Sequence, residues 1–211
     1  MAYLGKRKRS RCTIKQIWCI NEFMVLTDRE IQSAIQNQQI TIEPRPTDPA
    51  AYGSTSLDLT FGTSLRIWRT SAAVAGVIRE VVCPGAPGYT YRGFADAYSD
   101  LQEIGPTGYI LEPGLFVLGR TAEYIELPNH SRIAARVEGK SSLARLGVGI
   151  HITAPTIHAG FKGTIELELF NHGLLRVQLV PGMRVCQLIF EQTLGTPEKG
   201  YKGQFFGQAE V

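Results

Sequence analysis

The stretch Y-I-L-E-P-G-L-F-V-L-G-R-T-A-E-Y-I-E-L-P, residues 109–128, contains two apolar runs separated by a Pro-Gly pair. Pro113-Gly114 is typical of a tight turn, and Pro128 ends the second run because proline has no N–H to donate to a strand ladder. The stretch therefore predicts two short strands joined by a turn.

Similar runs lie on both sides of this stretch. Short apolar or alternating segments occur at 40–44, 56–62, 64–69 and 185–192, and Gly62 is expected to end one strand before the next begins. With 22 glycines and 11 prolines in 211 residues, short strands are favoured over long helices. The chain is therefore predicted to be mainly β, a barrel or sandwich with one or two short helices.

The longest helix is predicted near the start of the body. Thr27 or Asp28 can cap it, and Ile31, Ala34 and Ile35 follow at the spacing of one apolar helix face.

Residues 72–108 have the weakest pattern. Val77, Ile78, Val81 and Val82 suggest a strand, and the Gly- and Pro-rich segments that follow are typical of loops.

The positive charge of the chain is concentrated at its start. The net charge is +3, but residues 1–23 hold six basic residues and one acidic residue, so the remainder is slightly negative. A basic arm that touches nucleotide, RNA or membrane fits this segment, and so does an extension from an upstream start with Met24 as the older start. The body is not predicted to bind nucleic acid. We expect a basic extension at 1–23, a folded domain at 24–195 and a flexible C-terminal segment at 196–211.

The cysteine and hydropathy patterns favour a cytoplasmic protein with no membrane partner. The four cysteines are widely spaced and form no C-x-x-C pair, and no apolar segment follows the basic start as it would in a secretory signal. No run approaches the roughly 20 apolar residues that a membrane helix needs.

The densest group of polar side chains lies in R-V-E-G-K-S-S-L-A-R-L-G, residues 136–147. Lys140, Ser141, Ser142 and Arg145 present an ammonium, two hydroxyls and a guanidinium within six positions, a set that suits phosphate oxygens. The spacing of a P-loop is absent. A solvated, capped turn explains the same residues equally well.

A second motif, H-I-T-A-P-T-I-H-A-G-F-K-G-T-I-E-L-E-L-F-N at 151–171, ends in an alternating strand. Glu166 and Glu168 fall on one face and the intervening apolar side chains on the other. A carboxylate in a cleft can shuttle protons, but from the residues alone a solvated strand face is the simpler interpretation. The four histidines have no compact ligand spacing, so no metal site is predicted.

The order of these motifs resembles the dCTP deaminases of the trimeric dUTPase-like superfamily, from about Met24 to Gln208. The segments E-G-K-S-S-L-A-R-L-G, H-I-T-A, A-G-F-K-G-T-I-E-L-E-L-F-N and P-G-M-R-V-C-Q-L-I-F-E carry the resemblance. It implies a dUTPase-like distorted β-barrel of the β-clip type, and a homotrimer with active sites between subunits. The implied reaction is hydrolytic deamination of dCTP to dUTP and ammonia, with Mg²⁺ bound through the triphosphate. Zinc is not expected, because the sequence lacks the H-x-E and P-C-x-x-C elements of zinc deaminases.

The resemblance also implies roles for individual residues. Glu168 would be the catalytic acid and base, with Ser141, Arg145 and the Ala154 carbonyl around the reacting base and its water. The backbone around Glu166 and Leu167 would hydrogen-bond with the edge of cytosine, and Tyr201, Gln204 and Gln208 would contact the triphosphate. The full substrate-binding set that the resemblance implies is Lys140, Ser141, Ser142, Leu143, Ala144, Arg145, His158, Glu166, Leu167, Glu168, Tyr201, Gln204 and Gln208.

The sequence departs from the family pattern at three of these positions. His158 stands where an aspartate is common, Gln204 replaces a lysine, and Lys140 stands where arginine is usual. Because the phosphate-cleaving relatives use that aspartate, we expect the product to be dUTP rather than dUMP. A dUTP or dCTP diphosphatase, or a bifunctional deaminase-diphosphatase, is the alternative enzyme, and a nucleotide-sensing regulator on the same fold is the alternative without catalysis.

Overall fold

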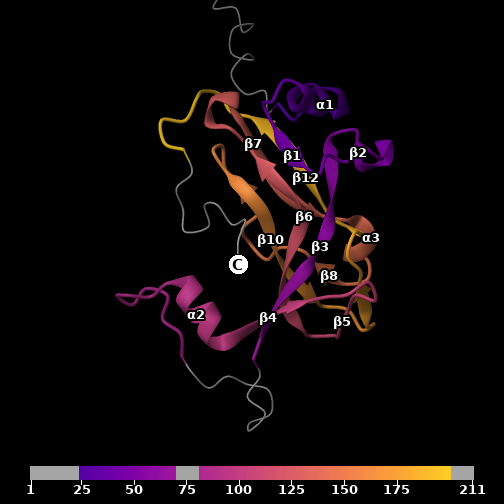
Figure 1. The fold of residues 1–211 in the computed structure, drawn as a ribbon, viewed down its shortest axis with the longest axis vertical. Helices are drawn as coiled ribbons and strands as arrows, with labels where there is room; N and C mark the ends of the chain where they lie inside the picture. Colours follow the sequence, from indigo (N-terminus) through magenta and orange to yellow (C-terminus); the bar gives the residue numbers. More distant parts are fainter. Residues whose placement is uncertain (1–23, 70–80, 201–211) are drawn as a thin grey trace, which may run out of the picture.

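The computed structural model describes residues 24–69 and 81–200. The described chain contains one ten-stranded antiparallel sheet. Its main path is β8-β10-β6-β3-β12-β7-β9, with β1 paired to β6 and with β2 and β4 paired to β3, and β5 and β11 form a second sheet of two strands. The elements along the main path are β3 (Ser56–Trp68), β6 (Phe116–Glu126), β7 (Ile133–Gly139), β8 (Val148–Gly149), β9 (Thr156–Ile157), β10 (Lys162–Asn171) and β12 (Arg184–Gln192). The mainly β prediction is therefore confirmed (Figure 1).

The remaining elements are short. They are α1 (Asp28–Gln36), β1 (Thr41–Glu43), β2 (Tyr52–Gly53), α2 (Tyr91–Tyr98), β4 (Ser99–Glu103), β5 (Tyr109–Leu111), α3 (Ser141–Ala144) and β11 (Val177–Leu179). Two single turns of 3-10 helix lie at Pro49–Ala51 and Asn129–Ser131. No helix in the described ranges is long and apolar enough to cross a membrane.

The predicted N-terminal helix and the predicted turn are both present. Thr27 precedes α1, and its backbone N–H donates to the Glu30 carboxylate at 3.2 Å, which closes a capping box. Ile31 and Ala34 form the buried face of the helix. The Pro-Gly turn separates β5 from β6 as predicted, although the pairing partner of β5 is β11.

Strand β3 differs from its prediction, because it continues through Gly62 instead of ending there. The register of β3 against β6 shifts between Phe61 and Leu65, so the glycine lies at a bulge. A Cβ at Gly62 would lie 3.1 Å from the Arg120 carbonyl oxygen, which is closer than most Cβ contacts, so the glycine eases the close approach of the two backbones. The bulge lets one long strand pair with β12 near its start and with β6 along the rest of its length.

The weakly patterned region holds a helix that the sequence analysis missed. Thr90 caps α2 by accepting a hydrogen bond from Gly93 N–H at 3.2 Å, and β4 follows directly and pairs with β3. The strand predicted at Val81 and Val82 is wrong: both lie in irregular backbone, and Val81 is 95% exposed. The other half of that prediction, Val77 and Ile78, lies outside the described residues.

Candidate active site

A cavity of about 570 Å³ lies against the polar face of β10. Its lining includes Glu166 and Glu168 from β10, residues of the segment from His151 to His158, and a group of aromatic side chains. That aromatic group, which includes Trp68, Tyr91 and Phe116, was not predicted. The cavity therefore joins the predicted carboxylates to residues from β3, β6, β7 and β9 and from helix α2.

The pairing of β10 with β6 sets the direction of the two glutamates. Glu166 lies opposite Arg120 and Glu168 lies opposite Leu118 in the antiparallel register. Leu167, the residue between the two glutamates, is fully buried. The strand therefore holds both carboxylates on its polar face, and a one-residue slip would bury them.

Glu168 is held by a hydrogen bond to the neighbouring loop. The backbone N–H of Ile152 donates to Glu168 Oε2 at 2.7 Å. Within the described residues the other carboxylate oxygen accepts no hydrogen bond. One oxygen thus fixes the orientation of the side chain, and the other keeps its capacity to accept a proton.

The loop that carries Ala154 is itself tied to β7. Val137 N–H donates to the Pro155 carbonyl at 2.8 Å, and β9 then pairs with β7 through Thr156. Ala154 and His158 are exposed and line the cavity, as the predicted site requires. The predicted residues Ala154, His158, Glu166 and Glu168 therefore do come together.

One edge of β10 is open beside these residues. On the side away from β6, β8 pairs only with Phe170 and Asn171, and no other strand of the described chain covers the edge from Lys162 to Leu169. The Leu167 side chain is buried, so only its backbone can meet a ligand. An open strand edge offers N–H and C=O groups, which suits the predicted reading of a base edge.

Tyr91 connects α2 to the site. Its hydroxyl donates to Glu166 Oε1 at 3.1 Å. Burial, together with the negative charge of Glu166, raises the pKa of Tyr91 well above its usual value. The helix has a recognisable signal in the sequence, because Thr90 is a good cap and Phe94 and Tyr98 share one face, but the glycine inside the short segment masks it.

The polar group at 140–145, which is predicted to suit phosphate, does not line this cavity. Lys140 precedes α3, and the motif residues Lys140, Ser141, Ser142, Leu143, Ala144 and Arg145 are absent from the cavity lining. Figure 1 shows α2 and α3 on opposite sides of strands β6 and β3. Ser141 and Arg145 are exposed, so they are available to a second molecule.

Two residues of the motif, Lys140 and Leu143, have structural roles in the described chain. The Lys140 ammonium lies 2.5 Å from both carboxylate oxygens of Asp58, a residue only 7% exposed, so the lysine compensates a buried charge. Leu143 is also buried, so its predicted contact with substrate can involve only its backbone.

Some predicted features cannot be placed. Tyr201, Gln204 and Gln208 lie outside the described residues, and so does the basic segment 1–23. Among the residues that the structure does describe, no three His, Cys, Asp or Glu side chains gather as a metal site.

Known proteins share both the sequence and the fold of this chain. A deaminase from Methanothermobacter thermautotrophicus named "dCTP deaminase, dUMP-forming" is 36% identical over 178 residues, which cover 84% of this chain and 83% of that protein. The dCTP deaminase of Rhodospirillum rubrum is 37% identical over 84% of this chain and 87% of that protein.

The fold comparison agrees. The crystal structure of 2'-deoxycytidine 5'-triphosphate deaminase from Agrobacterium tumefaciens superposes with a TM-score of 0.60 at 22% identity, over 81% of this chain and 48% of that chain. The family model described as dCTP deaminase-like matches residues 25–193. The chain therefore belongs to the dCTP deaminase-like family.

Proposed function

We propose that this protein removes the amino group from the cytosine ring of magnesium-bound dCTP by hydrolysis and releases it as ammonia. The observation that carries the proposal is Glu168, which lies on the open-edged strand with one oxygen fixed by Ile152 N–H and one oxygen available. The relatives reported above are named dCTP deaminases, and the match to this family spans most of the chain.

The first step uses Glu168 as a general base. Its carboxylate takes a proton from a water molecule as the water oxygen attacks C4 of the ring. The protonated Glu168 then donates that proton to the neighbouring ring nitrogen N3. The tetrahedral carbon now carries a hydroxyl and the amino group, with Ala154 beside it in the same cavity to orient the water through its carbonyl.

The second step expels ammonia. Glu168 takes the proton of the new hydroxyl and delivers it to the amino nitrogen, the C4–N bond breaks, and the C4 carbonyl of uracil forms. One water is consumed and one ammonia is released, so Glu168 ends the cycle ionised. We propose that Arg145 and Ser141 stabilise the charge that develops on the ring and the water.

The site is proposed to be complete only in a homotrimer. Ser141, Ser142 and Arg145 are exposed and do not line the cavity that contains Glu168, so a neighbouring subunit would supply them. Lys140 would contact phosphate from that neighbour as well, sharing its charge with Asp58. Tyr201, Gln204 and Gln208 would close over the triphosphate.

The product is proposed to be dUTP, made in the cytoplasm for thymidylate synthesis. His158 lines the cavity where phosphate-cleaving relatives are expected to place a carboxylate, and an imidazole has a different reach and direction. Cleavage to dUMP and pyrophosphate is the second candidate, because the Methanothermobacter relative is named dUMP-forming.

The test is an assay of purified protein with dCTP and excess Mg²⁺ in the presence of a zinc-selective chelator. Ammonia and pyrophosphate are measured separately, and the nucleotides are resolved by chromatography. The proposal expects ammonia equal to the dCTP consumed, dUTP as the nucleotide product and no loss of rate from the chelator. Absence of ammonia would refute the function, whereas equal amounts of pyrophosphate and dUMP would refute only the proposed product.

A further inference from the structure

Glu166 is the second carboxylate in the cavity, and the proposed chemistry leaves its side chain unused. Among the described residues it makes no ion pair, and its carboxylate accepts one hydrogen bond, from the Tyr91 hydroxyl at 3.1 Å. An ionised carboxylate can accept up to about four hydrogen bonds. A carboxylate with this much spare capacity, facing a ligand cavity, favours a ligand that brings N–H donors.

The hydrogen bond from Tyr91 fixes where that carboxylate lies. Since burial and the charge of Glu166 raise the pKa of Tyr91, the phenol keeps its proton and stays a donor at neutral pH. The helix that carries Tyr91 is in turn anchored to the sheet. Arg66 on β3 pairs with Asp96 of α2 at 3.2 Å and donates to Ser99 Oγ at 3.0 Å.

Aromatic packing adds to this anchor. The ring of Phe94 on α2 lies against Trp68 with 5.7 Å between centroids, and Trp68 lines the cavity. Tyr91 is therefore mounted on a helix that an ion pair and a ring contact hold to β3, and the residue that follows the helix is held by a hydrogen bond. Such a support keeps a side chain in one position while substrate enters.

We infer that Glu166 accepts a hydrogen bond from the exocyclic amino group of cytosine, and that Tyr91 is the positioning residue that orients it. This inference rests on the proposed deamination of dCTP. Glu166 and Glu168 are two residues apart on one strand face, about 6.5–7 Å along the strand. A ring lying against that face can present N3 to Glu168 and its amino group to Glu166.

The arrangement distinguishes substrate from product. Cytosine offers an N–H donor at C4, the group that Glu or Asp accepts in cytosine recognition. Uracil carries a carbonyl oxygen there, so two acceptors would face each other and binding would weaken. During turnover the leaving nitrogen gains a proton, and the fixed negative charge of Glu166 stabilises it while Glu168 supplies that proton.

The substitution Glu166→Gln tests this inference because it keeps the shape and adds an N–H donor. The kcat/KM for dCTP should fall about 10- to 100-fold, the range expected when a hydrogen bond to a charged group is lost. The second readout is the inhibition constant of dUTP, measured as a competitor of ammonia release. Its ratio to the KM for dCTP should fall about 10-fold or more, because the amide can donate to the uracil carbonyl.

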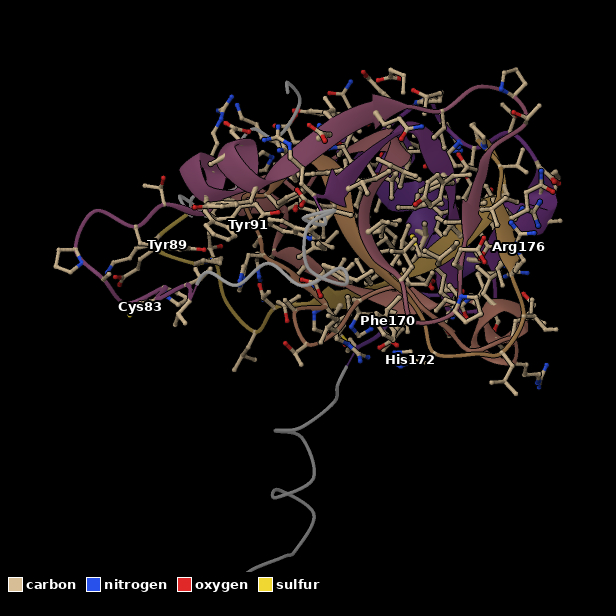
Figure 2. The ribbon with its side chains drawn as sticks, turned by 90° about the horizontal axis from the view of Figure 1, so that it is seen from below. Cys83, Tyr89, Tyr91, Phe170, His172 and Arg176 are labelled. Carbon is tan, nitrogen blue, oxygen red and sulfur yellow. The ribbon has the colours of Figure 1, made fainter. Side chains whose placement is uncertain are left out.

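Tyr91→Phe provides a second variant if Glu166→Gln does not fold. It keeps the ring and removes the donor, so discrimination against dUTP should weaken about 3- to 10-fold, with the melting temperature nearly unchanged. Tyr89→Phe is the matched control, since Tyr89 lies near Tyr91, contacts Phe94 through its ring and is absent from the cavity lining (Figure 2). It should leave both readouts unchanged.

The possible outcomes test the role of Glu166 and the proposed deamination separately. Suppose that the natural protein releases ammonia and that the folded variants keep the same ratio of the dUTP inhibition constant to the KM for dCTP. That result would overturn the role of Glu166 and leave the deamination intact. No ammonia release by the natural protein would overturn the proposed function, and this inference with it.

Discussion

At the scale of single residues, the two carboxylate oxygens of Glu168 have the different roles that a proton shuttle needs. One oxygen is fixed at 2.7 Å from Ile152 N–H, and this bond ties the carboxylate to the loop that also carries Ala154. The other oxygen is left for the reacting water. The carboxylate is therefore oriented by the backbone and needs no second side chain to place it.

Glu168→Gln should abolish turnover and leave binding of Mg-dCTP largely intact. The amide can still accept from Ile152 N–H, but it cannot take a proton from water, so the rate should fall by roughly 10²- to 10⁴-fold or more. Ammonia release measures the rate, and calorimetry measures the binding. Glu112→Gln is the control, because within the described residues Glu112 pairs with the exposed Arg176, which lies far from Tyr91 in Figure 2. Near-normal turnover in Glu168→Gln would exclude the assigned role.

At the scale of secondary structure, strands with alternating polar and apolar residues could be predicted from the sequence, and β-bulges could not. The pattern of β10 is decided by residues two apart, so the face of Glu166 and Glu168 follows directly from the sequence. The continuation of β3 through Gly62 depends instead on the approach of the β6 backbone, which no local pattern records. Helix α2 is short, contains a glycine and gains its stability from Arg66 and Trp68 on β3. Tyr91 was missed as a site residue for that reason.

Gly119→Ala should destabilise the fold by about 1–3 kcal/mol through overpacking. Gly119 lies between Leu167 on β10 and Leu65 on β3. A Cβ there would lie 2.6 Å from the Phe61 ring and 2.9 Å from Leu169 Cδ1, and both side chains are fully buried. Thermal unfolding should show a lower melting temperature. Gly85→Ala is the control, since nothing lies within 4 Å of its Cβ position, and equal melting temperatures for the two variants would contradict this packing.

At the scale of the whole molecule, the described chain separates the two halves of the predicted site. The carboxylate half is built on β10 and the loop after β8, whereas the motif at α3 lies off that cavity. The sequence could predict each half because each is a contiguous motif. It could not show from residue spacing alone that the folded chain leaves them apart.

Mixed oligomers should restore activity that neither parent has. If each site takes Glu168 from one subunit and Arg145 from its neighbour, co-expressed Glu168→Gln and Arg145→Ala chains will form some intact sites, up to about a quarter with random mixing. Two different tags allow the mixed species to be purified and assayed for ammonia release. Ser141→Ala mixed with Arg145→Ala is the control, because both changes fall on the same half. Equal failure of the two mixtures would show that the site lies within one subunit.

Removal of residues 1–23 should leave the fold and activity intact, because the backbone pairing of the described chain begins at Met24. The Met24 carbonyl accepts from Gln192 N–H at 3.0 Å, and Leu26 N–H donates to Phe190 O at 2.9 Å. A chain starting at Met24 should therefore keep its melting temperature and oligomeric size in chromatography. A chain starting at Thr27 loses these bonds to β12 and should melt at a lower temperature. An insoluble or monomeric product from the Met24 start would show that the basic segment is structural.

Hydrolysis at C4 can be followed in a single-turnover experiment in water labelled with heavy oxygen. Glu168 is proposed to deliver that water to the ring, so mass spectrometry of the nucleotide should find the label in the uracil base of dUTP. No pyrophosphate should form. Label in phosphate with an unlabelled base, or unchanged dCTP, would show that the protein does not hydrolyse dCTP at C4.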